Sequence, residues 1–233
     1  MRFEIYFLLF ILYSFLGWLM EVICKSFQYK RFMNRGFLIG PYCPIYGLGA
    51  LLIVFLLQGF SRHIGVLFLM SILICSGLEY FTSYLMEKIF RARWWDYSQK
   101  KLNINGRICF STTIPFGILG CVIVYYVHPF FLQVITSLPN VFIHVITFLL
   151  LILFLIDLSV SFHFIYKIRD IKVRGGRDNT EEITKRVKRI LIKKSGLYYR
   201  RMVNAYPNFK IAVKQKKDMI KQKLEKDIRI KKS

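Results

Sequence analysis

Long apolar stretches alternate with short polar segments along the first 166 residues of the chain. A helix needs about 20 apolar residues to cross a bilayer. Five stretches approach that length, and they cover residues 3–24, 44–58, 64–90, 108–127 and 141–166. The second stretch is short, whereas the third and fifth are long enough to tilt in the membrane. The pattern therefore predicts an all-α, polytopic membrane helix bundle in residues 1–166.

Basic residues fall unevenly between these stretches and predict an orientation. The four connecting segments carry 4, 1, 6 and 0 Lys/Arg in chain order, with Lys88 at the end of the third stretch counted in the six, and residues 167–233 carry 23. Cytoplasmic segments of membrane proteins are enriched in Lys and Arg. The alternation places the N-terminus outside and the C-terminus inside. Five crossings satisfy this arrangement, because an even number would put a basic segment on the wrong side.

Composition separates the chain into two parts. It has 35 Lys/Arg against 13 Asp/Glu and is 55% apolar, a combination unusual in soluble globular proteins. Residues 1–166 carry a net charge of +6, and residues 167–233 carry +16. We therefore expect a transmembrane helical domain over 1–166 and a basic cytoplasmic tail of amphipathic helices over 167–233. The tail is predicted to contact anionic lipid headgroups. A protein partner is the next alternative, and nucleic acid is the least favoured.

Motif searches exclude several kinds of chemistry. The five Cys are scattered without a CxxC pair, so neither a disulfide framework nor a zinc site is expected. The chain has no phosphate-binding GxxxxGK[ST] loop, no GxSxG elbow and no HExxH motif. No cofactor or metal is expected, and an enzyme is not the favoured class.

Acidic residues inside the apolar stretches are the main candidates for function. A charge within hydrocarbon costs about 3 kcal/mol on the insertion scale, so it is paired, neutralised or functional. With the predicted orientation, four carboxylates lie in the cytoplasmic third of the bilayer. Together with two arginines of the inner loops they predict a polar cavity that opens towards the cytoplasm. Its expected residues are Glu21, Glu79, Glu87, Asp157, Arg35 and Arg107. In the alternative interpretation, each carboxylate pairs with an arginine and only holds the bundle together.

The first inner loop is rich in glycine and proline and is too apolar for a solvated connection. Proline removes backbone donors and glycine permits left-handed backbone, so continuous helix is excluded. We expect a segment packed into the mouth of the bundle, re-entrant in form. Its marked residues are Asn34, Gly36, Gly40, Pro41, Pro44 and Gly47.

The second inner loop combines aromatic residues with a turn signal. Two tryptophans are predicted to anchor it at headgroup depth, with a stacking surface for a ligand as the alternative. The Asn-Gly pair predicts a turn that places Arg107 within reach of Glu79 or Glu87. The marked residues are Trp94, Trp95, Asp96, Tyr97, Asn105 and Gly106.

Several of these segments are long and unusual enough to indicate a family. They are SFLGW at 14–18 with Glu21, NRGFL at 34–38, GP at 40–41, CPIYG at 43–47, GLEY at 77–80 with Glu87, WWDY at 94–97 and NGR at 105–107. Over about residues 10–120 the chain resembles the bacterial "putative ABC-transporter type IV" (CmpB-like) membrane family. The resemblance implies a permease component in the bacterial cytoplasmic membrane. Because this chain has no nucleotide-binding domain, ATP coupling would need a separate ATPase subunit that docks on the inner loops.

Three functions follow as hypotheses. The leading one is a transporter-like permease component whose path is lined by Glu79, Glu87, Asp157 and Arg107. The second is a membrane enzyme acting on a lipid or lipid-linked substrate, with Glu79 or Asp96 as acid/base and Arg93 and Arg107 on a phosphate. The third is a non-catalytic scaffold or regulator that docks through the tail.

Overall fold

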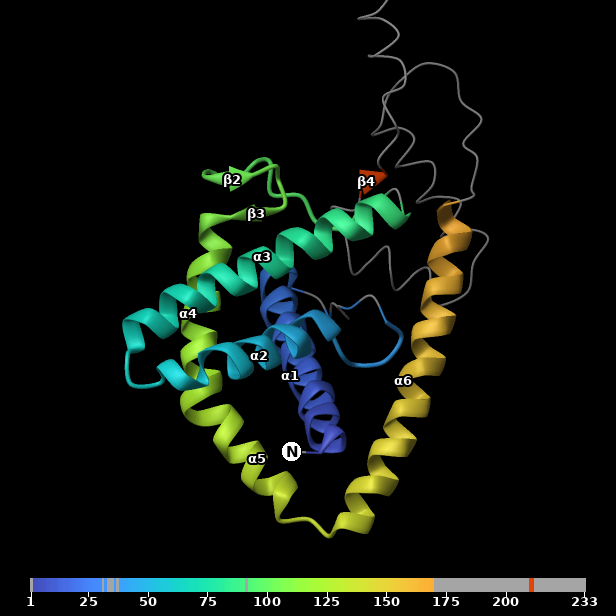
Figure 1. Cartoon of the computed structure of the whole chain (residues 1–233). Coiled ribbons are helices and arrows are strands. Elements are labelled where there is room, and N and C mark those ends of the chain that lie inside the picture. Colours follow the sequence, from blue (N-terminus) through green and yellow to red (C-terminus); the bar gives the residue numbers. More distant parts are fainter. Residues whose placement is uncertain are drawn as a thin grey trace, which may run out of the picture.

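The structure is a computed structural model that describes residues 2–30, 32, 36, 38–90, 92–169 and 210–211. These residues are almost entirely helical (Figure 1). Four helical segments among them are long and apolar enough to cross a membrane, at Phe3–Gln28, Ile64–Phe90, Phe110–Thr136 and Asn140–His163. The predicted all-α membrane bundle is confirmed.

The second predicted span is the exception in length. Helix α2 (Pro44–Leu57) continues into the 3-10 turn η1 (Gln58–Phe60). The combined Pro44–Phe60 segment is an apolar helix shorter than the other four. At 1.5 Å per residue it spans about 25 Å, against about 30 Å of hydrocarbon. Its passage across the bilayer, and with it the five-span orientation, stays a prediction.

Helix α1 (Phe3–Tyr29) crosses α2 at very short range. Glycine permits this approach, because a Cβ at Gly47 of α2 would lie 2.5 Å from the Phe10 carbonyl oxygen of α1. A Cβ at Gly120 would similarly collide with Ser71, where α4 (Phe110–Val122) crosses α3 (Ile64–Phe90). Small residues at helix crossings are the usual means of close packing in membranes. These two crossings hold α1 against α2 and α3 against α4.

The fourth predicted span, 108–127, is wrong at its C-terminal end. The helix continues from α4 through a π-turn, η2 (Ile123–Val127), into α5 (His128–Thr136). Pro129 has no N–H and would clash with the carbonyl four residues earlier in a regular helix. The π-turn accommodates it: the His128 N–H donates to the Ile123 carbonyl, five residues back. The helix therefore passes the proline and ends nine residues later than predicted.

Helix α6 (Asn140–Arg169) completes the helical part of the chain. Figure 1 shows its C-terminal end beside the C-terminal end of α3, at the same end of the molecule as the small hairpin of β2 (Asn103–Ile104) and β3 (Ile108–Cys109). The N-terminus and the turn between α5 and α6 lie at the opposite end of the molecule. The basic segment after α3 and the start of the basic tail thus share one end, as the charge alternation requires.

The described core lies between these helices. Leu9 and Tyr13 of α1 pack with Ile135 of α5 and Ile143 of α6. A second cluster around Ile53 joins α2 to α3 and the π-turn. The second cluster also adjoins the polar residues described below, because Ile53 lines their cavity.

The Asn-Gly turn predicted in the second inner loop is present. Strands β2 (Asn103–Ile104) and β3 (Ile108–Cys109) pair antiparallel around it. Asn105 and Gly106 have φ values of 52° and 65°, a region that asparagine and glycine adopt at low cost. A second short pair joins β1 (Ala92–Arg93) to β4 (Lys210–Ile211). The predicted amphipathic helices of the tail lie outside the described residues, and the division at residue 166 stays a prediction.

Candidate functional site: a polar cavity between α1, α2, α3 and α4

A cavity of about 150 Å³ lies between α1, α2, α3 and α4, beside the aromatic loop that follows α3. Its polar lining comes from four different segments of the chain. Glu21 is on α1, Tyr46 on α2, Glu79 on α3, and Tyr97 in the loop after α3. The rest of the wall is mainly apolar and aromatic and includes Phe116, Leu78, Ile53 and Ile123. The space is large enough for several water molecules or a small organic group.

Glu79 is the most constrained acidic residue of this cavity. Glu79 is only 9% exposed. One of its carboxylate oxygens, Oε1, accepts a long hydrogen bond of 3.3 Å from the Tyr97 hydroxyl. The other oxygen, Oε2, is buried and has no hydrogen-bond partner among the described residues. Buried polar atoms in proteins are nearly always paired. An unpaired carboxylate oxygen on a residue that lines a cavity therefore points to a ligand or a proton.

Glu21 reaches the same cavity from α1. Its Oε1 accepts a hydrogen bond of 2.7 Å from the Tyr46 hydroxyl of α2. Tyr46 in turn packs its ring against Gly17, one helical turn before Glu21. The glycine thus gives the tyrosine room to lie across α1 and to direct its hydroxyl at the carboxylate.

Tyr97 and Trp95 close the cavity from the loop side. The Trp95 indole N–H donates to the Arg107 carbonyl at 3.0 Å, and the Tyr97 backbone N–H donates to the Gly106 carbonyl at 2.8 Å. The hairpin turn therefore holds both rings in place. Burial, with the nearby Glu79 carboxylate, raises the pKa of the Tyr97 hydroxyl. The hydroxyl thus stays protonated and remains a donor at neutral pH.

A more open vestibule adjoins the cavity and shares Glu21, Tyr46, Glu79 and Tyr97 with it. Lys25 of α1 and Lys100 of the loop are among its other lining residues, with Trp94 and Asp96. The Lys100 ammonium lies 5.4 Å from the centre of the Tyr97 ring. The described route into the cavity is therefore mixed in charge, and Glu21 and Glu79 are the acidic residues that it shares with the cavity.

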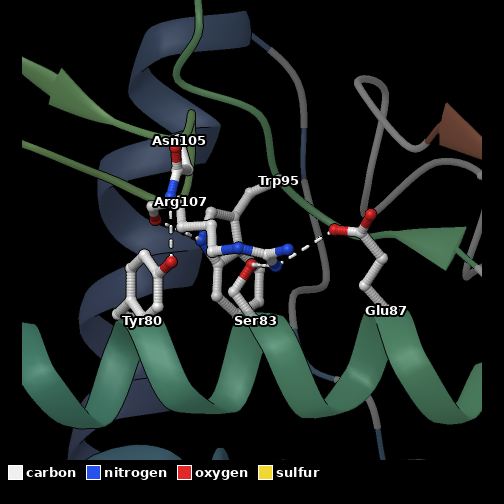
Figure 2. A network of polar contacts seen from close by, with 6 residues as sticks. All are labelled: Tyr80, Ser83, Glu87, Trp95, Asn105 and Arg107. Atoms are coloured by element: carbon white, nitrogen blue, oxygen red, sulfur yellow. Dashed lines mark hydrogen bonds and ion pairs between the residues drawn. The ribbon is translucent and has the colours of Figure 1, made fainter.

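Arg107 and Glu87 form a separate cluster outside the described lining of the cavity (Figure 2). The Arg107 guanidinium lies 3.0 Å from Glu87 Oε2, and it also donates to the Ser83 hydroxyl at 3.4 Å. Its guanidinium carbon is 5.6 Å and 5.4 Å from the ring centres of Tyr80 and Tyr84. We call Tyr80, Ser83, Tyr84, Glu87, Asn105 and Arg107 the hairpin clamp.

The clamp fastens the hairpin to α3. Asn105 adds a hydrogen bond of 2.9 Å from its side-chain amide to the Tyr80 hydroxyl. Figure 2 shows these residues of the hairpin above the face of α3 that carries Tyr80, Ser83 and Glu87. Of the two partners predicted for Arg107, the structure pairs it with Glu87. The ion pair fits the alternative interpretation of Glu87, in which the carboxylate pairs with an arginine and holds the bundle together.

Asp157 lies apart from the cavity and holds the first inner loop. Its carboxylate accepts hydrogen bonds from the backbone N–H groups of Ile39 (2.9 Å) and Gly40 (2.7 Å). The hydroxyls of Tyr42 and Ser161 donate to the same carboxylate at 2.5 Å and 2.9 Å. Four donors satisfy this charge within the protein. Asp157 is therefore an anchor on α6, and it does not line the described cavity as the sequence had suggested.

The glycine- and proline-rich loop has the packed character expected for it. Leu38 is 1% exposed, and the Cys43 N–H donates to the Ser14 carbonyl of α1 at 2.9 Å. Gly36, with φ 114°, lines the cavity, and Pro44 begins α2. The predicted site residues Asn34 and Arg35 lie outside the described residues.

The remaining marked residues have local roles. Trp94 is 3% exposed and packs edge-on against Phe90 at the end of α3, so protein surrounds its ring. Asp96 accepts from the Ser98 N–H at 3.0 Å and shapes the turn. Sequence analysis did not single out the Tyr46 hydroxyl as a partner of Glu21. The signal present in the sequence was the spacing of Gly17 and Glu21, which lie one helical turn apart, so that a tyrosine packed on the glycine can reach the carboxylate.

No group of three or more His, Cys, Asp or Glu side chains capable of holding a metal ion occurs within the described part of the chain. The cavity instead offers two carboxylates, two phenol hydroxyls and aromatic rings. This set can bind a cation or exchange a proton.

Comparisons with known proteins agree with the sequence motifs. A family model described as "Putative ABC-transporter type IV" matches residues 8–162. The match extends beyond the predicted limit of residue 120 and includes most of α6, so the Asp157 anchor lies within the family region. No curated protein and no solved structure matches the chain. Since the matched region covers more than half of the sequence and contains the cavity, the clamp and the anchor, this multi-pass membrane protein belongs to the "putative ABC-transporter type IV" family.

Proposed function

We propose that the chain is the membrane-embedded permease component of a transporter in a bacterial cytoplasmic membrane. In this proposal the cavity is the solute site and Glu79 is its main binding group. Glu21, held by Tyr46, supplies a second negative charge. The vestibule is the entrance from the cytoplasmic side.

The unpaired Oε2 atom of Glu79 is the observation that carries this proposal. An ionisable group left unsatisfied within a membrane protein is costly, because neither lipid nor protein replaces its hydration. Glu87 is paired with Arg107 and Asp157 accepts from four donors, so this chain can satisfy a carboxylate. The exception at Glu79 is therefore best explained by a function.

ATP coupling, which the family description suggests, requires a separate ATPase subunit in this proposal. The hairpin and the clamp are candidates for its docking surface, because they lie at the end of the molecule with the basic segments (Figure 1). Anionic lipid headgroups are the proposed partner of the tail.

A labelling experiment tests the orientation on which the entrance depends. A single cysteine at Ser98, in a chain whose five native cysteines are replaced, is treated with a membrane-impermeant maleimide on intact cells. We expect no labelling until the cells are opened. Labelling from outside would reverse the proposed entrance.

Strains carrying Glu79→Gln test the transport role. We expect this variant to reproduce the changes in cellular solute content seen in a deletion strain, at equal protein level in the membrane. Glu4→Gln is the matched control, since Glu4 lies at the other end of α1 beside His144. Solute content that stays normal in Glu79→Gln would reject the proposal.

The lipid-enzyme hypothesis has less support. It needs Arg107 to bind a phosphate, whereas the structure pairs Arg107 with Glu87. A changed lipid composition in the Glu79→Gln strain, with normal solute content, would favour the enzyme over the transporter. If deletion of residues 170–233 alone abolished the function of the protein, this result would favour the scaffold.

A further inference from the structure

We infer that the cavity at Glu79 binds a protonated alkyl amine, with the ammonium group on Glu79 and the alkyl chain on the apolar wall. This inference rests on the proposed function and names the chemical class of its solute. It depends on the negative charge of Glu79, on the hydrogen-bond donors that its carboxylate lacks, and on the apolar and aromatic lining of the cavity.

The charge and the missing donors define one end of the ligand. Glu79 Oε2 is buried without a partner in the part of the chain that the structure describes, and the carboxylate of Glu21, which lines the same cavity, adds to the negative potential. A carboxylate accepts but does not donate, so its complement is a cation that carries N–H groups. Charge-assisted hydrogen bonds of this kind are about twice as strong as neutral ones.

The wall of the cavity defines the other end. Ile53, Leu78, Leu119 and Ile123 offer an apolar surface next to the carboxylates. Bound metal ions such as Na⁺, Ca²⁺ or Mg²⁺ need a shell of oxygen ligands, which this wall does not provide. An alkyl chain gains free energy by leaving water for such a surface. The lining thus favours an amphiphilic cation over an inorganic one.

Aromatic rings complete the match. Trp95, Tyr97, Tyr46 and Phe116 all line the cavity. The faces of such rings attract ammonium groups. The Lys100 ammonium, 5.4 Å from the Tyr97 ring centre, shows that this aromatic wall already receives an ammonium group on its vestibule side. A volume of about 150 Å³ limits the ligand to a short chain.

Binding to the purified full-length chain in lipid nanodiscs tests the inference. The probe is n-propylammonium chloride in phosphate buffer, without amine buffers, at pH 7, where alkyl amines are protonated as lysine is. Intrinsic tryptophan fluorescence, to which Trp95 of the cavity wall contributes, and the thermal unfolding midpoint are recorded during titration. We expect a saturable change in fluorescence and a rise in the unfolding midpoint.

Variants and competing cations decide the outcome. Glu79→Gln should weaken propylammonium binding about tenfold or more, as expected for loss of a charged hydrogen-bond partner, whereas Glu4→Gln should bind like the natural chain. Tetramethylammonium, which has no N–H, and Na⁺ should bind at least about tenfold more weakly than propylammonium. Equal binding by Na⁺, equal binding by Glu79→Gln, or no saturable change would each overturn the inference.

The two proposals fail separately. If propylammonium does not bind while Glu79→Gln still reproduces the deletion strain, the ligand class is wrong and the transporter proposal stands. If propylammonium binds through Glu79 and the strain's solute content is normal, the site is correct and the transport role is wrong.

Discussion

Glu79 and Glu87 lie on the same helix, eight residues or about 12 Å apart, yet their surroundings are opposite. Glu87 meets a guanidinium that two tyrosines and a serine also hold. Among the described residues, Glu79 meets one phenol at 3.3 Å and retains a buried oxygen without a partner. Residue type and helical position do not separate a structural carboxylate from a functional one. The partners supplied by the neighbouring loop do.

Arg107→Ala should disturb the clamp most. It removes the guanidinium that lies 3.0 Å from Glu87 Oε2, and breaking a buried ion pair costs about 3–5 kcal/mol. Because the Glu87 side chain is 23% exposed, we expect a smaller loss of about 2 kcal/mol in the free energy of unfolding. Chemical denaturation in detergent measures it. The exposed Lys101→Ala should change little, and an equally small effect of Arg107→Ala would mean that the clamp does not stabilise the fold.

Asp157→Ala extends the comparison to a third carboxylate. Four donors lose their acceptor, so the first inner loop should open more often. In a chain that retains only Cys43, we expect maleimide labelling of Cys43 to accelerate about tenfold, the factor for one charged hydrogen bond. Ser159→Ala on the same helix is the control, since Ser159 bonds only the Leu155 carbonyl in the described structure. Unchanged labelling would separate Asp157 from the loop.

Glu79→Gln and Glu87→Gln should differ in stability. Glu87→Gln removes a paired charge and should lower the free energy of unfolding by about 1 kcal/mol. Glu79→Gln relieves an unpaired charge and should leave that free energy within about 0.5 kcal/mol of the natural value, while it abolishes function. Equal losses in the two variants would show that Glu79 is a structural residue after all.

Tyr97→Phe should have the smallest effect. It removes the one donor to Glu79, but the bond is long and its loss should cost about 0.5 kcal/mol in unfolding free energy. The ring and its place in the cavity wall remain. Thermal unfolding of this variant beside Glu79→Gln measures the difference. A loss as large as that of Arg107→Ala would mean that the phenol is the main support of the loop.

The lengths of the apolar stretches in the sequence predicted most of the helices. The third apolar stretch coincides with α3, because flanking polar residues mark both of its ends. The extension through α5 was missed, since Pro129 normally ends a helix and a π-turn leaves no simple trace in the sequence. The hairpin was foreseen at its turn only, because strands of two residues have no periodicity to detect.

The candidate site was accessible in part, for a geometric reason. Position along a helix gives the depth of a carboxylate in the bilayer, and depth grouped Glu79 with Asp157. The direction around the helix axis depends on packing, and it turns Asp157 towards the first inner loop. Partner choice also depends on packing: Arg107 had two carboxylates within expected reach, and the hairpin geometry brings it to Glu87.

The π-turn at Ile123–Val127 holds one more residue than an α-helical turn would need, and it therefore resets the angular phase of everything that follows. Each residue advances a regular helix by about 100°. With this insertion, Gly120 meets Ser71 before the turn, and His128 meets the Tyr13 hydroxyl at 2.8 Å after it. Deleting one residue of the turn would rotate α5 by about 100° and carry His128 away from α1. The continuous helix from α4 to α5 can thus place Gly120 against α3 and His128 against α1, which a helix without the π-turn could not do together.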